Sequence, residues 1–344
     1  MISLLIVNYR SAELAIEAIR SARAASARPL HVVVVDNSVD EAQADLLRPH
    51  CEVLLLSPAN IGYAAAINVG RRKCEGSAIV VSNPDVVFRD SAIDILASAL
   101  DDERVAVAGP ALYWDDRLEW ILPPSDLQTA WDKLDETLAT RSEVWFSWRD
   151  RRRIRRRLRF WELESQTAVK AISGAVMAIS ARDFDAVGGF DERFRLYFEE
   201  NDFLRRVAAA GKSILYVPEA RCRHLYNQSA GQSADAAAFY AQSEKAYLEK
   251  WYGSRVANTL TRLVREIRLP EPPRAGISIP IAERDVFVEA SPLRTFSTAA
   301  GHFPGGGSLH VPAEVWRSYR GNALYLRVVR RADARVLATY ATYK

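Results

Sequence analysis

The stretch GGFDERFRLYFEENDFLRRVAAAGKSILYVPEARCRHLYNQS, Gly188–Ser229, combines turn, helix and strand signals with a dense group of acidic side chains. It begins with a Gly-Gly turn and places Glu199, Glu200 and Asp202 together at the start of a predicted helix. Four apolar residues at helical spacing give that helix one buried face: Phe203, Leu204, Val207 and Ala208. Gly211 is placed to end the helix, and a short strand is predicted at Ile214–Val217.

Two interpretations of the acidic cluster stay open from the residues alone. Carboxylates at a helix N-terminus are stabilised by the helix dipole and by free N–H groups, so acidic helix starts are common in ordinary structural helices. Here two adjacent glutamates follow the aromatic pair Tyr197-Phe198 and precede a loop that carries His224. This combination favours a catalytic or binding role for the glutamates.

Composition restricts the class of protein. A chain of 344 residues can form two domains, and with 49% hydrophobic and 26% charged residues it is typical of a globular protein in water. The net charge of +3 gives no global basic field, so nucleic acid is not expected as a partner. Three cysteines without C-x-x-C spacing indicate a reducing compartment, and we find neither a signal peptide nor a membrane-spanning run. We therefore expect a cytoplasmic protein.

The first 110 residues alternate apolar runs with helical patterns, which predicts a mostly parallel sheet with flanking helices. The expected strands are Ile2–Val7, Val32–Val35, Val53–Leu56, Ala78–Val81 and Val105–Ala108. The expected helices lie near 12–25, 40–48, 62–74 and 90–101. Ligands of such sheets bind beyond the carboxyl ends of the strands, so the residues that follow each strand are candidates for the site.

Those strand ends are unusually polar. They read Asn8-Tyr9-Arg10, Asp36-Asn37-Ser38, Asn60-Ile61-Gly62-Tyr63 and Asn83-Pro84-Asp85. Each is a common turn sequence by itself, but together they predict one polar rim at the ligand-binding edge. Neither G-x-G-x-x-G nor G-x-x-x-x-G-K-[ST] is present, so a diphosphate would need another source of positive charge.

A divalent cation is the expected source of that charge. Asp85 offers a hard oxygen ligand at a strand end, and His224 is a candidate second ligand from the other half of the chain. Mg²⁺ or Mn²⁺ with few protein ligands and with phosphate oxygens in the other positions fits this pair. A lone loop histidine is also common as a structural residue.

In this order, the motifs resemble those of the family 2 glycosyltransferases with the GT-A fold, and the chain is similar to the rhamnosyltransferase-like branch. The resemblance covers roughly residues 1–230. It rests on the four strand ends, on Asn68, on Gly188-Gly189-Phe190-Asp191-Glu192, on the acidic segment Tyr197–Arg205, and on His224…Ser229. It implies an α/β GT-A domain that uses a nucleotide-diphosphate sugar.

The resemblance also implies roles for single residues. The implied nucleotide and donor ligands are Asn8, Tyr9, Arg10, Asp36, Asn60, Gly62, Asn68, Asn83 and Asp85. The D-x-D metal motif of the family corresponds to Asn83-Pro84-Asp85, so metal binding is expected mainly at Asp85 with His224. The catalytic base falls on Glu200, where the family has Asp, and this departure leaves Glu199 as a rival. Ser173, Gly174 and Asp202 are expected on the acceptor side, with Asp202 more suited to capping the helix or orienting its neighbours.

The implied reaction is a metal-dependent, inverting transfer of a sugar to a hydroxyl of a glycan or lipid-linked acceptor. The branch indicates dTDP-rhamnose as the donor, with UDP- or GDP-sugars as alternatives. A nucleotidyltransferase would need a basic phosphate-gripping motif, which Arg10 alone does not supply. A non-catalytic sugar-nucleotide or glycan-binding module remains the other alternative, because Glu replaces Asp at the base position.

The rest of the chain departs from the strand–helix alternation. Residues 111–167 contain six tryptophans, a predicted hairpin at Tyr113–Leu122 and an arginine-rich segment, Arg149–Phe160. Arg151–Arg159 reads as a basic amphipathic segment that suits either an anionic membrane surface or plain solvation. We expect a strand pair in Lys170–Ser180.

The expected domain organisation follows. Residues 1–267 form the GT-A domain, with 111–167 as an acceptor-side insertion, and helices are expected at 233–252 and 254–267. Residues 268–276 form a Pro-rich linker, and 277–344 form a small β-sandwich-like accessory domain. Homo-oligomerisation and peripheral attachment to the inner membrane face stay open.

Overall fold

The computed structural model describes residues 1–225, 236–263, 267, 269–276, 278–281, 283–318 and 321–343. The chain divides into two compact units. Unit 1 comprises Met1–Ala111, Ser125–Gln128 and Glu164–Ala257, and unit 2 comprises Leu112–Pro124, Thr129–Leu163 and Asn258–Lys344. Most of the segment that the sequence analysis placed as an insertion in the first domain therefore groups with the C-terminal region.

Unit 1 is built on a mixed sheet, in which nine strands lie within the described residues. One half is parallel, in the order β3-β2-β1-β4, as the apolar runs predicted. Its strands are β1 (Ile2–Asn8), β2 (Leu30–Asp36), β3 (Val53–Leu56) and β4 (Ala78–Ser82). The other half contains β5 (Val86–Phe88), β6 (Val105–Tyr113), β7 (Thr167–Val169), β8 (Val176–Ser180) and β9 (Ser213–His224).

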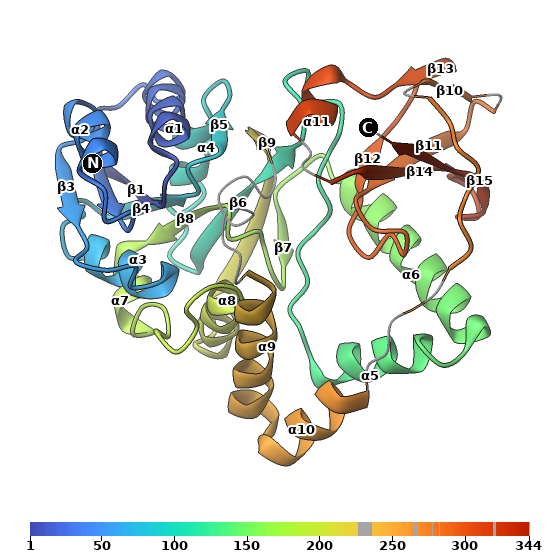
Figure 1. Ribbon diagram of the computed structural model, residues 1–344. Coiled ribbons are helices and arrows are strands. Elements are labelled where there is room, and N and C mark those ends of the chain that lie inside the picture. Colours follow the sequence, from blue (N-terminus) through green and yellow to red (C-terminus); the bar gives the residue numbers. More distant parts are fainter. Residues whose placement is uncertain are drawn as a thin grey trace. The chain divides into compact units, whose positions relative to one another are not determined.

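Helices cover both faces of this sheet (Figure 1). On one face lie α1 (Ala12–Ala24), α2 (Glu41–Leu47) and α4 (Ala92–Ser98). On the other lie α3 (Tyr63–Arg71), α7 (Ala181–Ala186) and α8 (Glu199–Ala209). A short 3-10 turn (Arg48–His50) follows α2, and α9 (Ala236–Tyr252) packs Tyr247 against Phe194 and Phe198.

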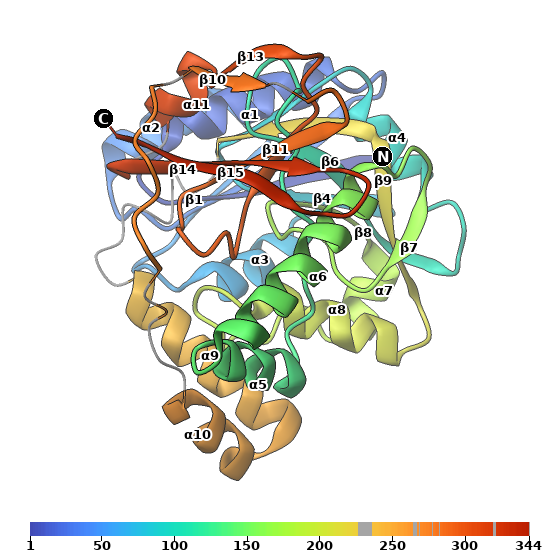
Figure 2. The ribbon, with the colours of Figure 1, turned by 90° about the vertical axis from the view of Figure 1, so that its right-hand side faces the viewer.

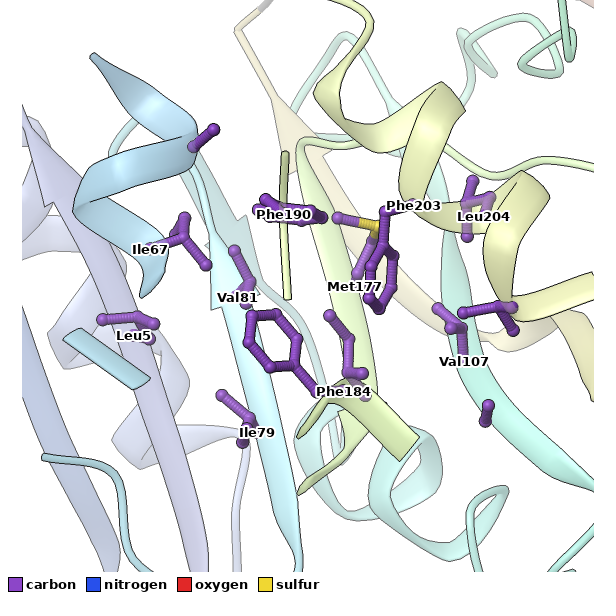
Figure 3. Close-up of a cluster of buried hydrophobic side chains, with 14 of the residues drawn as sticks. Leu5, Ile67, Ile79, Val81, Val107, Met177, Phe184, Phe190, Phe203 and Leu204 are labelled. Atoms are coloured by element: carbon purple, nitrogen blue, oxygen red, sulfur yellow. The ribbon is translucent and has the colours of Figure 1, made fainter. Parts of the chain in front are cut away.

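Three phenylalanines join α7, α8 and the Gly-Gly turn into one core. The ring centroids of Phe190 and Phe203 lie 4.9 Å apart, and the Phe184 ring lies 5.8 and 5.5 Å from them. Figure 3 shows these rings packed on Met177 of β8, beside side chains of the parallel strands. The α8 helix is therefore fixed to the sheet at the end that carries the acidic cluster.

The antiparallel half of the sheet corrects two predictions. The strand pair expected in Lys170–Ser180 does not form, because β7 pairs with β9, whereas β8 lies between β4 and β6 and is antiparallel to both. The strand predicted at Ile214–Val217 extends to His224, and its end pairs with β5, which the sequence analysis did not predict. These pairings join segments far apart in the chain, which local periodicity does not record.

Unit 2 begins with the predicted hairpin. Tyr113 forms an antiparallel bridge with Ile121, and the buried Asp115 carboxylate accepts hydrogen bonds from the N–H groups of Glu119 and Trp120. Helices α5 (Ala130–Ala139) and α6 (Glu143–Trp161) follow, and α10 (Ser254–Leu263) belongs mainly to this unit.

The C-terminal region is mostly β-structure, as predicted. A four-stranded antiparallel sheet has the order β12-β11-β14-β15, and β10 pairs with β13 beside a short helix, α11. The bounds are β10 (Ser278–Ile281), β11 (Val286–Ser291), β12 (Ala300–His302), β13 (Gly307–His310), α11 (Ala313–Ser318), β14 (Ala323–Arg330) and β15 (Val336–Tyr343). Part of the predicted linker pairs with this sheet, since the Ala275 N–H donates to the Ala341 carbonyl and the Ala341 N–H donates to Pro273.

Helix α6 packs against the four-stranded sheet within unit 2 (Figure 2). Ile154, Leu158 and Trp161 of α6 share a core with Phe287 and Val329. Gly301 lets Trp161 approach, because a Cβ at that position would lie 2.5 Å from the indole ring. Among the tryptophans of α6, Trp161 is thus a core residue, whereas Trp148 is exposed.

Several predicted segments extend beyond the described residues. They are the His224…Ser229 motif after Leu225, the beginning of the helix predicted at 233–252, residues 264–266 of the helix predicted at 254–267, residue 268 of the linker, and residues 277, 282, 319–320 and 344 of the accessory domain. The described part of the chain contains no helix that is both long and apolar enough to cross a bilayer.

Candidate active site

A cavity of about 360 Å³ lies in unit 1 at the polar strand ends. Most of its lining comes from segments singled out in the sequence. The lining residues are Val7, Tyr9, Asn37, Asn60, Gly62, Tyr63, Asn83, Pro84, Ser173, Gly174, Ala175, Arg195, Leu196, Tyr197, Glu199, Glu200, His224 and Phe239. The cavity thus lies beyond the carboxyl ends of the parallel strands, where ligands of parallel sheets bind.

The acidic pair enters the cavity from the first turn of α8. Glu199 is the first helical residue, and the two residues before it, Tyr197 and Phe198, both adopt left-handed backbone conformations with φ of 69°. Such conformations are rare for aromatic residues and persist where packing holds them, often at functional sites. Gly174 lies against Glu200, because a Cβ at position 174 would lie only 3.3 Å from the Glu200 Cγ. The strained turn and this close approach together fix both carboxyl groups in the cavity wall.

Burial governs the protonation of the two glutamates. Removal from water raises the pKa of Glu199 well above its usual range, and the charge of Glu200 raises it further. Burial also raises the pKa of Glu200, but backbone N–H groups at the helix start and the Asn201 amide, 3.3 Å away, oppose this effect. Two such close carboxyls do not ionise together readily. Of the two carboxyls, Glu199 is therefore the more readily protonated, because burial and the charge of Glu200 both raise its pKa.

Several polar atoms of the cavity have no hydrogen-bond partner among the described residues. They are Asn37 Oδ1, the Tyr63 hydroxyl, Glu199 Oε2 and Glu200 Oε2, all buried. Burial, followed by the charges of Glu199 and Glu200, raises the pKa of Tyr63 far above its ordinary value, so its hydroxyl remains a donor. Buried polar groups in folded proteins are normally satisfied, so these four atoms indicate a ligand rich in hydroxyl groups.

Asp85 and His224 are brought together by the pairing of β5 with β9. Val86 pairs with His224 in the register, and the Leu225 N–H donates to the Asp85 carbonyl over 3.2 Å. His224 Nε2 lies 3.4 Å from Asp85 Oδ1, and both side chains are buried. A carboxylate and an imidazole fit a Mn²⁺ or Mg²⁺ ion whose other positions are filled by ligand oxygens. Within the described residues no third His, Cys, Asp or Glu joins them as a metal-binding group.

Asn8 and Asp36 lie next to the cavity but do not line it. The Asn8 amide donates to Asp36 Oδ1 over 2.9 Å, and its carbonyl oxygen accepts from the backbone and hydroxyl of Ser11. Asp36 Oδ1 also accepts from the N–H and hydroxyl of Ser38. These bonds tie the ends of β1 and β2 together and so position Tyr9 and Asn37, which do line the cavity. Arg10 is exposed, and its guanidinium lies 5.3 Å from the Tyr9 ring centroid.

Asn60 and Gly62 form one wall together with Arg195. The Arg195 guanidinium donates to the Asn60 carbonyl, the Tyr63 N–H donates to the Arg195 carbonyl, and the Asn37 amide donates to the Gly62 carbonyl. Gly62 has φ of +89°, and a Cβ there would lie 2.8 Å from the Arg195 carbonyl oxygen. This position therefore requires glycine.

Two further predicted residues are engaged elsewhere. The Asn68 side chain donates to the Phe190 carbonyl over 2.8 Å and accepts from the Phe190 N–H over 2.9 Å, so it fastens α3 to the Gly-Gly segment. Asp202 is fully buried and pairs with Arg206 and with Lys250 of α9 at 2.8 and 2.6 Å. Because neither lines the cavity, we do not include them in the proposed ligand site.

The structure adds cavity residues that sequence reasoning missed. Arg195 and Phe239 line the cavity, and the buried Tyr63 hydroxyl lies close enough to Glu199 and Glu200 to feel their charges. Tyr63 belonged to a recognised motif, whereas nothing in the sequence marked Arg195 or Phe239. The Arg195 guanidinium lies 5.3 Å from the Phe239 ring centroid, a contact between segments that α8 and β9 separate along the chain.

A family model and two curated proteins that resemble this chain all describe glycosyltransferases. Residues 1–242 match the model of the glycosyltransferase-like family 2. An N-acetylglucosaminyl-diphospho-decaprenol L-rhamnosyltransferase occurs in two strains of Mycobacterium tuberculosis, CDC 1551 and H37Rv. Each is 28% identical over 251 residues, covering 64% of this chain and 74% of the relative.

Similar solved structures include a mannosyltransferase of Pyrobaculum calidifontis in complex with GDP-mannose and Mn²⁺, with 16% identity and a TM-score of 0.48. They also include TarS 1–349 of S. aureus, with 12% identity and a TM-score of 0.43. The alignments cover 76% of this chain in both cases, and 68% and 70% of the other chains.

The family match spans residues 1–242, which include the nine-stranded sheet and the motifs at the strand ends. The predicted fold class and the predicted family are therefore confirmed. The chain belongs to the family 2 glycosyltransferases and has a GT-A fold with a small all-β region.

Proposed function

We propose that this glycosyltransferase moves a sugar from a nucleotide-diphosphate donor to a hydroxyl group of a glycan or lipid-linked glycan, with inversion at the anomeric carbon. The observation that carries the proposal is the buried Glu199–Glu200 pair, which opens into the same cavity as His224, the neighbour of Asp85. Several buried oxygens of that cavity have no hydrogen-bond partner within the described part of the chain, and such oxygens suit a polyhydroxylated ligand.

Glu200 is the proposed catalytic base. Its carboxylate is stabilised by the N-terminus of α8 and by the Asn201 amide, while burial keeps it basic. The acceptor oxygen forms a bond with the anomeric carbon as the bond from that carbon to the diphosphate oxygen breaks. The acceptor proton passes to Glu200, and a single displacement of this kind inverts the configuration.

Glu199 and Tyr63 are proposed to position the sugar. A protonated Glu199 and the Tyr63 hydroxyl can each donate a hydrogen bond, and both residues line the cavity and carry a buried oxygen without a partner among the described residues. A divalent cation held by Asp85 and His224 would neutralise the charge of the diphosphate leaving group. Tyr9, Asn37 and the wall of Asn60 and Gly62 are proposed to hold the nucleoside.

The mycobacterial relatives refine the choice of substrate. Their name describes transfer of L-rhamnose to an N-acetylglucosaminyl-diphospho-decaprenol acceptor. We propose rhamnose from dTDP-rhamnose as the first donor to test for this chain, with UDP- and GDP-sugars as the next candidates. The proposed acceptor is a glycan carried on a lipid diphosphate.

Replacement of Glu200 tests the assignment. We expect Glu200→Gln to lower kcat by at least a thousandfold, because the base is lost, with the donor Kd in the presence of Mn²⁺ changed less than threefold. Glu199→Gln is the matched control, and it should retain at least a tenth of kcat because a neutral donor remains at that position. Release of nucleoside diphosphate and calorimetric binding of the donor provide the two readouts.

Two results would count against the proposal. Equal losses of turnover and donor binding in Glu200→Gln would make Glu200 a binding or folding residue. Donor binding without any acceptor-dependent release of nucleoside diphosphate by the wild-type chain would favour a sugar-nucleotide-binding module.

A further inference from the structure

The eight arginines of α6 fall into groups with different surroundings. Arg149 and Arg152 pair with the buried Asp135 of α5 at 2.8 and 2.6 Å. Arg157 is buried and donates to Glu289 of β11 over 2.5 Å. These three arginines are used inside unit 2, so the basic character of the segment is not one continuous surface.

A second group forms an outward row. Arg151, Arg155 and Arg159 are each four residues apart, which places them along one side of the helix, and all three are exposed. Across the described residues, no carboxylate lies within 4.0 Å of any of them. Arg155 and Arg159 contact only backbone carbonyl oxygens, at 3.5 and 3.3 Å. Three fixed positive charges therefore face outward without a counter-charge from the described part of the chain.

Apolar side chains continue the same face toward the helix start. Val144 is 82% exposed and Trp148 is 51% exposed, an unusual degree for such residues. Trp148 is held in place by the Arg152 guanidinium, 4.4 Å from its ring centroid, and by Trp145 at 5.2 Å. These residues and the arginine row line one hollow of about 760 Å³, together with Glu143, Ser147 and Arg152. We call this face the outer face of α6.

We propose that the outer face of α6 binds the surface of an anionic lipid bilayer, with the row of Arg151, Arg155 and Arg159 on the phosphate groups and with Trp148 and Val144 in the interfacial region. A guanidinium fork matches phosphate geometry, and indole rings favour the boundary between water and lipid. An amphipathic helix with arginines on one part and apolar side chains on the other suits attachment in the plane of a bilayer. The inference rests on unit 2 alone and does not depend on the proposed catalytic roles.

Vesicle binding by the full chain tests this assignment. Vesicles of phosphatidylcholine alone are compared with vesicles that also contain phosphatidylglycerol, at low and at physiological salt. We expect binding only to the anionic vesicles, weakened by salt. The triple variant Arg151→Gln, Arg155→Gln, Arg159→Gln should bind roughly a hundredfold less tightly, since each surface arginine contributes on the order of tenfold or less.

The matched control removes the same charge elsewhere. The control variant combines Arg28→Gln, Arg48→Gln and Arg104→Gln, which replace three arginines that each pair with a carboxylate on the surface of unit 1. This control should bind anionic vesicles within threefold of the wild type. Trp148→Ala should weaken vesicle binding while leaving its salt dependence unchanged, because it removes an apolar contact and no charge.

Several outcomes would overturn the assignment. They are equal binding to neutral and anionic vesicles, equal losses in the triple variant and in the control, and binding to an oligonucleotide or to soluble polyphosphate but not to vesicles. The far-ultraviolet circular dichroism of each variant checks folding. If the triple variant does not fold, the single variants Arg151→Gln and Arg155→Gln provide the same comparison.

Discussion

Glu199 and Glu200 are neighbours in the chain but differ in their surroundings. Burial raises the pKa of both carboxyls and backbone donors oppose this effect at both, but only Glu200 also accepts a hydrogen bond from the Asn201 side chain. A base must be ionised to accept a proton, so transfer should fall as the pH drops through the raised pKa of the pair. We expect the acidic limb of the kcat/KM profile to lie above the ordinary range of a glutamate, about 4.3.

The same profile distinguishes the two carboxyls. Glu199→Gln removes the group that competes for the charge, so the acidic limb should move to lower pH while the rate on the plateau stays within tenfold. If the acidic limb of the kcat/KM profile is unchanged in Glu199→Gln, the two carboxyls do not share a proton.

Gly62 supports a second prediction at the residue scale. Gly62→Ala would place a Cβ in a left-handed backbone position and 2.8 Å from the Arg195 carbonyl oxygen. We expect a loss of unfolding free energy larger than the roughly 1–2 kcal/mol of the backbone term alone. The donor affinity should also fall, because the wall of the cavity must shift. Chemical denaturation and calorimetric titration measure the two effects.

Gly211→Ala is the control for Gly62→Ala. Gly211 has a similar φ of +77°, but a Cβ there meets nothing within 4 Å. It should show only the backbone term and unchanged donor affinity. Equal effects of both variants would mean that contact with Arg195 is not what constrains Gly62.

At the scale of elements, α6 and the C-terminal sheet are joined by a buried ionic cluster. Glu289 of β11 accepts from Arg157 of α6 and from Arg327 of β14, each over 2.5 Å, and Arg327 also pairs with Asp150 of α6 at 2.7 Å. Burial acts to raise the pKa of Glu289, but the charges of Arg327 and Arg157 together lower it. The hydrophobic contacts of Trp161 and Phe287, 5.9 Å apart, lie beside this cluster.

Glu289→Gln should be strongly destabilising. It leaves two buried guanidinium groups without their shared carboxylate, and breaking such clusters costs about 3–5 kcal/mol. A carboxyl with a depressed pKa stabilises the fold above its unfolded pKa, and this contribution is lost as the pH falls through the folded pKa. The stability difference between wild type and Glu289→Gln should therefore be largest near neutral pH and shrink in acid.

Denaturation across a pH series measures this difference. Glu283→Gln is the control, since Glu283 and its partner Arg330 are both partly exposed to water and the loss of this pair should have little effect. A difference between wild type and Glu289→Gln that does not change with pH would argue against the ionic interpretation.

At the scale of the whole molecule, unit 2 is assembled from segments that interrupt the chain of unit 1 and from the segment that follows it. Residues 129–163 share a core with residues from 258 onward, through Ile154, Leu158 and Trp161 on one side and Phe287 and Val329 on the other. A chain that ends at residue 276 should therefore expose the apolar face of α6. We expect it to lose helical signal or to aggregate, which circular dichroism and light scattering would detect.

Hydrogen exchange gives the complementary test on the full chain. If α6 folds as part of unit 2, its backbone amides should be protected from exchange to the same degree as the amides of β11 and β14. A truncated chain that keeps the stability of α6 would instead support an independent accessory domain at 277–344, as expected from the sequence.

Local patterns predicted a large part of this protein. Runs such as Leu4–Val7 and Val32–Val35 recorded the buried strands, and polar residues after those strands marked the cavity edge. The sequence by itself therefore determined the alternation of strands and helices in the parallel half of the sheet, the fold class and the family, because hydrophobic periodicity and strand-end motifs are properties of neighbouring residues.

Only the tertiary structure decided which of these residues meet. The pairing of β5 with β9 brings Asp85 to His224, and the hydrogen bonds of Asn68 with Phe190 fasten α3 to the Gly-Gly segment. Folding also separates Arg157, buried against Glu289, from Arg151 on the outer face of α6. The physical reason is that burial, charge pairing and pKa depend on atoms contributed by segments far away in the chain, which no local pattern records.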